Sequence, residues 1–245
     1  MVFALVFTVL LLLCLLPLNL TAMSRMLPAG VRFLPLLVTA LLWAHTLLFR
    51  LKGRGGAVGV VILVFFYILT IGLVFLPTLS SLLFAVLDRP HDRPPSIYGQ
   101  DRFDREIFLV VHPGPSDFPS AVTEHMAETL AAAGFRVTVY SARADLRLEA
   151  GKAAALGLIS PIYAGRIRPP LENFIANNDL KGIKCFWLLA GSDPNSGDSD
   201  IARATPLVEA RGGKVIAGTK VIAGKDREPA FAEVKRLAAE LAGKL

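Results

Sequence analysis

The chain has 245 residues, of which 53% are hydrophobic, and its mean hydropathy of +0.54 is too high for one ordinary soluble domain. The apolar excess lies before about residue 88, and the remainder has the composition of one globular domain with its own core. The net charge is +6, and the excess of basic residues lies mainly beside the apolar segments. This distribution is typical of a membrane protein and not of a nucleic-acid-binding protein.

Three apolar stretches predict a transmembrane region over residues 1–87. The predicted spans are residues 2–20, residues 33–49, and residues 57–76 with an extension to 87. The first stretch lacks a basic segment before it and a clear cleavage site, so a retained helix is favoured over a signal peptide. The chain is therefore expected to be an integral protein of a bacterial-type inner membrane, with membrane lipid as a partner.

The distribution of basic residues predicts the orientation. Three spans place Arg25 and Arg32 on the same side as the C-terminal domain, together with four arginines between residues 88 and 105. The positive-inside rule then makes that domain cytoplasmic, although the basic loop at 50–54 argues for the opposite orientation.

The positions of the cysteine and histidine residues do not suggest a metal site. Cys14 and Cys185 form neither a metal motif nor a disulfide framework, so no metal site is expected. His45 lies within the second predicted span, and an interhelical hydrogen bond or an interfacial position is favoured there over a haem or proton-transfer role.

Residues 88–104 are rich in proline and charge and are expected to form a linker. The domain then begins, over residues 105–245, with an unbroken apolar strand at 107–111. A polar loop and a helix from about Pro119 to Gly134 follow, and a second strand covers residues 136–140.

The pattern then alternates between strands and helices to the end of the chain. Strands are predicted at 153–160, 183–190 and 215–223, and helices at 169–177, 199–210 and 229–241. Gly218 indicates a bulge or a close approach within the last strand. Five such alternations predict an α/β fold with a five-stranded parallel sheet. The strand order taken for this sheet is 2-1-3-4-5, one of the common doubly wound orders.

The loops after strands one, three and four are rich in small and polar residues and should meet at one edge of this sheet. The first joins backbone N–H groups to a helix N-terminus, which suits a phosphate. In the second loop, an aromatic side chain flanked by small residues, Tyr163, can lie along a flat heterocycle. In the third, the GSDPNSG run at 191–197 can offer backbone amides to the edge of a ring.

Two stretches carry a resemblance to the flavodoxin-like superfamily. HPGPSDFPSA at 112–121 resembles the HPxPxSFxxA loop of flavodoxin-fold NAD(P)H:quinone oxidoreductases. SPIYAG at 160–165, with PPL at 169–171, resembles the flavin-ring loop of flavodoxins and related reductases. The similarity covers about residues 105–245 and implies a bound FMN or FAD.

The resemblance assigns the cofactor to three sets of residues. The phosphate loop would use His112, Ser116, Phe118, Ser120 and Ala121. The flavin ring would be framed by Pro161, Ile162, Tyr163 and Gly165, and its edge closed by Gly191, Ser192 and Asn195. The resemblance identifies no catalytic residue.

The first loop departs from the reductase pattern at one position. Asp117 stands where the reductases have a serine, and a carboxylate there opposes a phosphate unless it points away or caps the helix. An N-cap role is favoured for Asp117, and solvent-exposed positions are favoured for Arg166 and Arg168.

The leading hypothesis is a membrane-anchored flavoprotein. If it is an enzyme, we expect an FMN-dependent NAD(P)H:quinone oxidoreductase. It would pass electrons from NAD(P)H or a protein donor to a quinone or another membrane-associated acceptor. The alternatives are a flavin-free binding or regulatory module and a non-enzymatic tethered electron carrier. Nucleic acid is not expected as a partner, and a homodimer is left open.

Overall fold

The computed structural model describes residues 92–99, 105–149, 153–163 and 165–245, together with residues 61, 65, 68, 79, 83 and 87–89. The chain divides into two compact units, Met1–Leu87 and Asp88–Leu245. The predicted spans at 2–20 and 33–49 lie outside the described residues, as do all but six positions of 57–87. Within the described part of the chain, no helix combines the length and the apolar character that crossing a membrane requires.

The described residues of the second unit form a six-stranded sheet in the order β1-β3-β2-β4-β5-β6. Five strands are parallel, and their order β3-β2-β4-β5-β6 is the predicted 2-1-3-4-5. The strands are β1 (Ser96–Tyr98), β2 (Glu106–Val111), β3 (Arg136–Ser141), β4 (Ala155–Pro161), β5 (Lys184–Gly191) and β6 (Lys214–Ile222).

Strand β1 corrects the sequence prediction, which placed only a linker at residues 88–104 and expected five strands. β1 pairs antiparallel with β3, with Ser96 opposite Val139 and Tyr98 opposite Val137. Ile97 and Tyr98 are good strand formers, and β3 would otherwise be an open edge. Three residues are too few to show the alternating pattern of a strand in the sequence. The segment is identified as a strand only by its pairing with β3.

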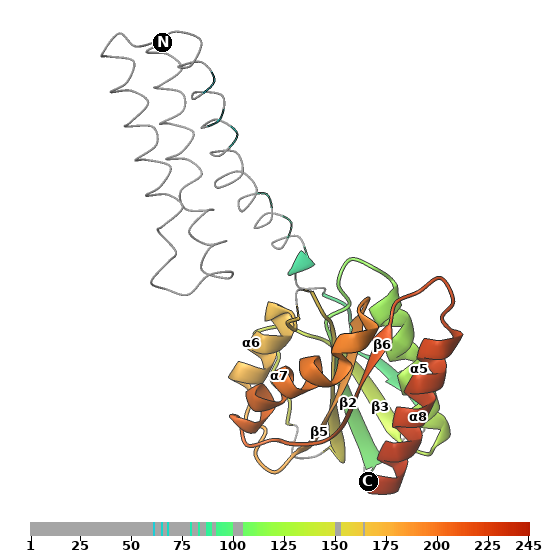
Figure 1. Cartoon of the computed structure of the whole chain (residues 1–245). Coiled ribbons are helices and arrows are strands. Elements are labelled where there is room, and N and C mark those ends of the chain that lie inside the picture. The colour runs from blue at the N-terminus through green and yellow to red at the C-terminus, as the bar shows by residue number, and fades with distance from the viewer. Residues whose placement is uncertain are drawn as a thin grey trace. The chain divides into compact units, whose positions relative to one another are not determined.

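Helices cover both faces of the sheet (Figure 1). α5 (Phe118–Ala132) and α8 (Glu228–Lys244) pack on one face, and α6 (Pro169–Asn177) and α7 (Gly197–Glu209) pack on the other. A short 3₁₀ turn, η5 (Pro194–Ser196), precedes α7. This doubly wound arrangement, with its 2-1-3-4-5 order, is a flavodoxin-like fold.

Local sequence explains where these elements begin and end. α5, α6 and α8 each carry proline at the first or second helical position, where no intrahelical N–H bond is lost. Gly134 follows α5 with a φ of +88°, a left-handed conformation that stops the helix. All seven residues of β4 are buried, as its unalternating apolar sequence predicts.

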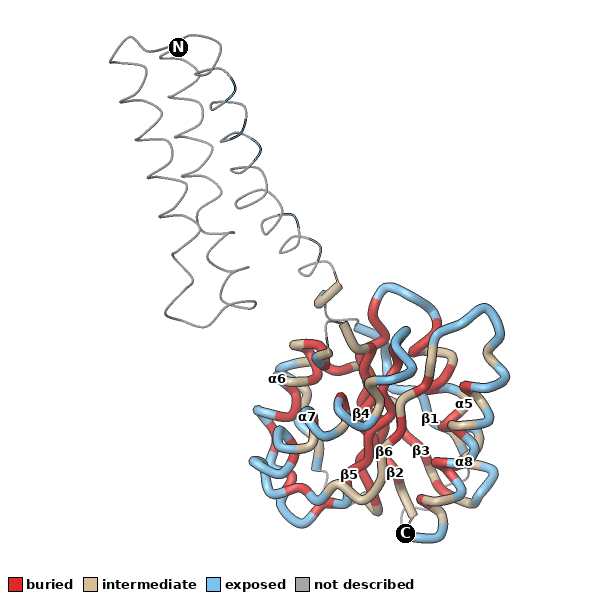
Figure 2. The backbone as a smooth tube through the Cα atoms, in the orientation of Figure 1, coloured by how far each residue is buried: buried red, intermediate tan, exposed pale blue. Residues whose placement is uncertain are grey.

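The core has two parts, one on each side of the sheet, and the strands between them are buried throughout much of their length (Figure 2). Gly157 of β4 lies between Leu109 of β2 and Phe186 of β5. A Cβ atom at Gly157 would come within 2.5 Å of carbon atoms of both side chains. The close packing of these three central strands therefore depends on glycine at this position.

Strand β6 contains an irregularity, though not at the expected residue. Cys185 pairs with Val215, but Phe186 pairs with Ala217, so the extra residue of the ladder is Ile216. Gly218 is a position of close approach instead, because a Cβ atom there would lie 3.3 Å from the Cβ of Trp187.

Substituting Gly157 by alanine should destabilise the domain. The added methyl group must displace Leu109 or Phe186 in a closed core, at a cost of about 1–3 kcal/mol. Urea unfolding of the full chain, followed by circular dichroism, measures this cost. Gly243→Ala is the matched control, since nothing lies within 4 Å of its added Cβ in α8, and it should leave stability unchanged or slightly raised. Equal stability of the two variants would contradict the packing argument.

Candidate functional site

The loops after β2, β4 and β5 begin side by side at one edge of the sheet. His112 N–H donates to the carbonyl of Ile159 at 3.0 Å, which continues the pairing of β2 with β4. Ile162 N–H donates to the carbonyl of Ala190 at 2.7 Å, which continues the pairing of β4 with β5. The three strands that were expected to carry the site are therefore neighbours, and their carboxyl ends meet.

The first loop folds onto the second. Gly114 has a φ of +67°, and a Cβ atom there would lie 3.0 Å from Pro161 Cγ and 3.5 Å from Tyr163 Oη. Tyr163 is half-buried at this contact. Two loops that are about 50 residues apart in the sequence therefore share one surface, as the sheet order requires.

The predicted phosphate-loop residues separate into three environments. His112 and Phe118 are buried, and Phe118 belongs to the core beneath α5. Ser116 is exposed, and Ser120 and Ala121 are half-buried in the first turn of α5. Ser120 lines a cavity of about 70 Å³ together with residues of β1 and β3. Phe118 is thus a packing residue, whereas the serines remain accessible.

Asp117 occupies the N-cap position of α5, but its side chain makes no capping hydrogen bond. Its Oδ2 accepts a hydrogen bond from an Arg227 Nη at 2.7 Å, from the residue that precedes α8. This hydrogen bond and the charge of Arg227 hold the pKa of Asp117 below its usual value. Asp117 therefore stands at the predicted N-cap position without a capping hydrogen bond. Its carboxylate is instead compensated by an arginine 110 residues away.

The second loop is a tight turn in which Tyr163 and Arg166 exchange backbone hydrogen bonds, both of 3.2 Å. Gly165 provides the left-handed residue of this turn, with a φ of +69°. Burial raises the pKa of Tyr163, against the opposing charge of Arg168, so the phenol is neutral at physiological pH.

Arg168 is buried beneath this turn, which corrects the expectation that it is exposed to solvent. Its guanidinium lies 5.3 Å from the centre of the Tyr163 ring. Its Nε donates to Asp88 Oδ1 at 2.7 Å, and the two side chains are 7% and 10% exposed. Its backbone N–H donates to Ser160 Oγ at 3.2 Å. Asp88, from the predicted linker, therefore helps to hold Arg168 beside the Tyr163 ring.

The third loop contains one buried and two exposed candidates. Gly191 is buried, whereas Ser192 and Asn195 are exposed. Asn195 N–H donates to Asp193 Oδ1 at 2.9 Å, which shapes the start of η5. The exposed side chains remain available to a ligand.

Sequence reasoning missed Lys220 of β6, which lies beneath this loop. A Cβ atom at Gly191 would come within 2.6 Å of Lys220 Cε, so the lysine packs directly against the glycine. Lys220 Nζ is 2.7 Å from Asp200 Oδ2 in a buried ion pair. The signal in the sequence was a lysine within a mostly apolar strand, because a lysine that is buried there needs a charged partner.

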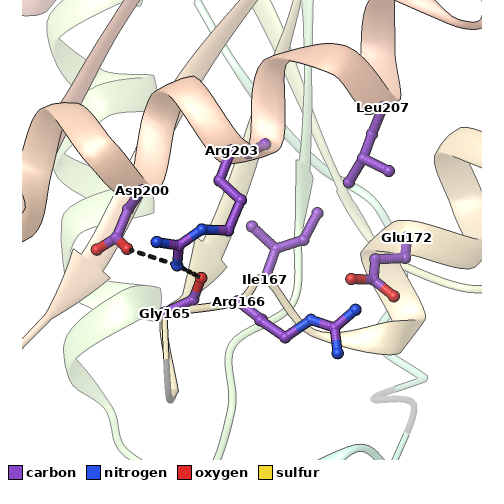
Figure 3. Close-up of a pocket in the computed structure, with 8 residues that line it drawn as sticks. Gly165, Arg166, Ile167, Glu172, Asp200, Arg203 and Leu207 are labelled. Carbon is purple, nitrogen blue, oxygen red and sulfur yellow. Dashed lines mark hydrogen bonds and ion pairs between the residues drawn. The ribbon is translucent and has the colours of Figure 1, made fainter. Parts of the chain in front are cut away.

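A cavity of about 140 Å³ lies beside the second loop, between α6 and α7 (Figure 3). Its polar lining includes Arg166, Glu172, Asp200 and Arg203. Burial raises the pKa of Glu172, and the neighbouring arginines partly oppose that shift. Among the described residues, no group of three or more His, Cys, Asp or Glu side chains could hold a metal ion.

Comparison with known proteins shows similarity only to solved structures. No family model matches the chain, and no curated protein matches it. A flavodoxin from Streptococcus pneumoniae TIGR4 is 14% identical, with a TM-score of 0.44 over 58% of this chain and 99% of that one. Flavodoxin 2 from Bacillus cereus is 16% identical, with a TM-score of 0.46 over 58% and 99%. General stress protein 14 from Treponema denticola, solved in complex with FMN, is 15% identical, with a TM-score of 0.41 over 57% and 96%. The fold assignment rests on the strand order of this chain itself.

Replacing Asp88 by asparagine should destabilise the domain, because the buried guanidinium of Arg168 would lose the carboxylate that accepts its Nε–H hydrogen bond. The expected loss is about 3 kcal/mol in the free energy of unfolding. Asp92→Asn is the matched control, since Asp92 contacts Arg143 in an exposed pair that contributes at most about 1 kcal/mol. Chemical denaturation of the full chain compares the two, and a loss for Asp88→Asn that is no larger than the loss for Asp92→Asn would contradict the assignment.

Proposed function

We propose that this chain is a flavin-binding electron-transfer protein that holds FMN at the carboxyl ends of β2, β4 and β5. The observation that supports the proposal is the close approach of the backbone at Gly114 to Pro161 and Tyr163, beside the hydrogen bond from Ile162 to Ala190. Ligands of doubly wound sheets bind at such a switch point. The same loops carry the sequence resemblance to flavin-binding proteins.

The residues at this edge suit the chemical parts of FMN. The start of α5, with the hydroxyl groups of Ser116 and Ser120, would hold the phosphate, and Arg227 adds positive charge beside Asp117. Tyr163 would lie along the isoalloxazine ring, and the 191–195 loop would cover its edge. The bound flavin supplies the redox chemistry, while these residues orient it and exclude water.

The proposed acceptor follows from the apolar stretches before residue 88. Five described residues of the third stretch are apolar, helical and more than half exposed, as lipid-facing side chains would be: Val61, Phe65, Ile68, Leu79 and Leu83. We therefore propose that residues 1–87 anchor the domain to the cytoplasmic face of a membrane. A quinone is then the natural acceptor, and NAD(P)H or a reduced protein is the donor.

Purified full-length protein should be yellow, with the absorbance of an oxidised flavin, or should become so on addition of FMN. Tyr163→Ala should weaken FMN binding about tenfold, because the ring loses its stacking surface. Tyr140→Ala is the control, since Tyr140 is also half-buried but lies at the end of β3. Colourless protein that does not bind added FMN would overturn the proposal. Flavin-bound protein that does not oxidise NAD(P)H with quinones would be an electron carrier.

A second candidate, a flavin-free binding or regulatory module, is favoured by the carboxylate in the first loop and its pairing with Arg227. Asp117→Ser distinguishes the two functions. In a flavin site it removes a negative charge near the phosphate and releases Arg227, so FMN should bind several-fold more tightly in a fluorescence titration. Asp179→Ser makes the same charge change at an exposed distant position and should have no effect. A flavin-free module would bind FMN in neither variant.

A further inference from the structure

A buried ion pair beneath the third loop joins three successive elements. Lys220 of β6 and Asp200 of α7 are 2.7 Å apart, and their side chains are 3% and 1% exposed. Ser196 of η5 donates to Asp200 Oδ2 at 2.9 Å and accepts from Lys220 Nζ at 2.5 Å. One carboxylate oxygen therefore fixes the end of the 191–196 loop to the sheet.

The second oxygen of Asp200 faces the turn after β4. Oδ1 is buried, has no hydrogen-bond partner among the described residues, and lies 3.7 Å from an Arg203 Nη. The same nitrogen of Arg203 donates to the carbonyl of Gly165, so the guanidinium lies between Asp200 and the turn (Figure 3). A Cβ atom at Gly165 would come within 2.3 Å of this nitrogen, which makes a side chain there incompatible with the contact.

The carboxylate is ionised in this arrangement. Burial alone raises the pKa of Asp200, but the hydrogen bonds from Lys220 and Ser196 outweigh burial and hold the pKa below its ordinary value. A buried ion pair is a weak source of net stability, because desolvation opposes the attraction. What the pair does provide is a defined geometry, since each partner loses much if the other moves.

We propose that Asp200 is a positioning residue of the candidate site, which fixes the distance between the 163–166 turn and the 191–196 loop. These two segments are the ones proposed to frame the flavin ring and cover its edge. The inference rests on the proposed function only for the nature of the ligand. The coupling of the two segments through Asp200 exists without any ligand.

Hydrogen exchange of the full-length protein, without added flavin, tests the coupling directly. Asp200→Asn should increase backbone exchange in residues 163–166 and 191–196. Asp198→Asn is the matched control, because Asp198 is an exposed aspartate in the same first turn of α7 and the change in charge is identical. Asp198→Asn should leave the backbone hydrogen exchange of both segments unchanged. Equal exchange in the two variants, or a uniform increase over the whole domain in Asp200→Asn, would overturn the proposal.

Arg203→Gln provides a second variant should Asp200→Asn fail to fold. Arg203 is 57% exposed, so its replacement leaves the buried pair of Lys220 and Asp200 intact and removes only the guanidinium that joins Asp200 to Gly165. Exchange should rise in the 163–166 turn and stay unchanged in the 191–196 loop. An unchanged turn would overturn the role assigned to Asp200.

An FMN titration then connects the coupling to the site. The dissociation constant should rise about tenfold in Asp200→Asn and stay unchanged in Asp198→Asn. If the wild-type protein does not bind FMN while the exchange results hold, the proposed function fails and the positioning role stands. If FMN binds equally to all variants, the positioning role fails and the proposed function stands.

Discussion

Burial of the parallel strands on both faces is the constraint on which the rest of the domain depends. Parallel strands need crossovers, and the crossovers of this chain place α5 and α8 on one face and α6 and α7 on the other. The central strand β4 then has room for no side chain at Gly157. Because β2, β4 and β5 are adjacent, their loops must emerge together. The candidate site is a direct consequence of this sheet order.

Two buried ion pairs hold the turns at the ends of the strands, in addition to the hydrophobic core. Arg168 with Asp88 supports Tyr163, and Lys220 with Asp200 supports the loop after β5. The first pair joins segments 80 residues apart and the second joins α7 to β6. Each removes charge from water at an energetic cost that only close pairing offsets. Hydrophobic packing determines where the strands lie, whereas these pairs determine how the turns at their ends are held. The geometry of the site therefore depends on polar contacts more than that of the core does.

The first loop combines a favourable and an unfavourable feature for an anion. A helix N-terminus and two serine hydroxyl groups favour a phosphate, and the carboxylate of Asp117 opposes it. Arg227 compensates that carboxylate from the far end of the domain sequence. The charges of Asp117 and Arg227 thus neutralise each other without a ligand. A single substitution at Asp117 therefore distinguishes a flavin-binding loop from a loop with another function.

The sequence alone determined the five parallel strands and the four helices, because apolar runs, prolines and glycines act locally. The strand order, and with it the meeting of three loops at one edge, was taken from the doubly wound fold type and is confirmed by the pairing of the strands. The sequence did not reveal β1, whose three residues are a strand only beside β3. It also did not reveal the ion pairs of Asp117 and Arg168, since the partners Arg227 and Asp88 are 110 and 80 residues away. Tertiary structure decided which charges are paired, because ion pairs depend on distance in space, and no local pattern records that distance.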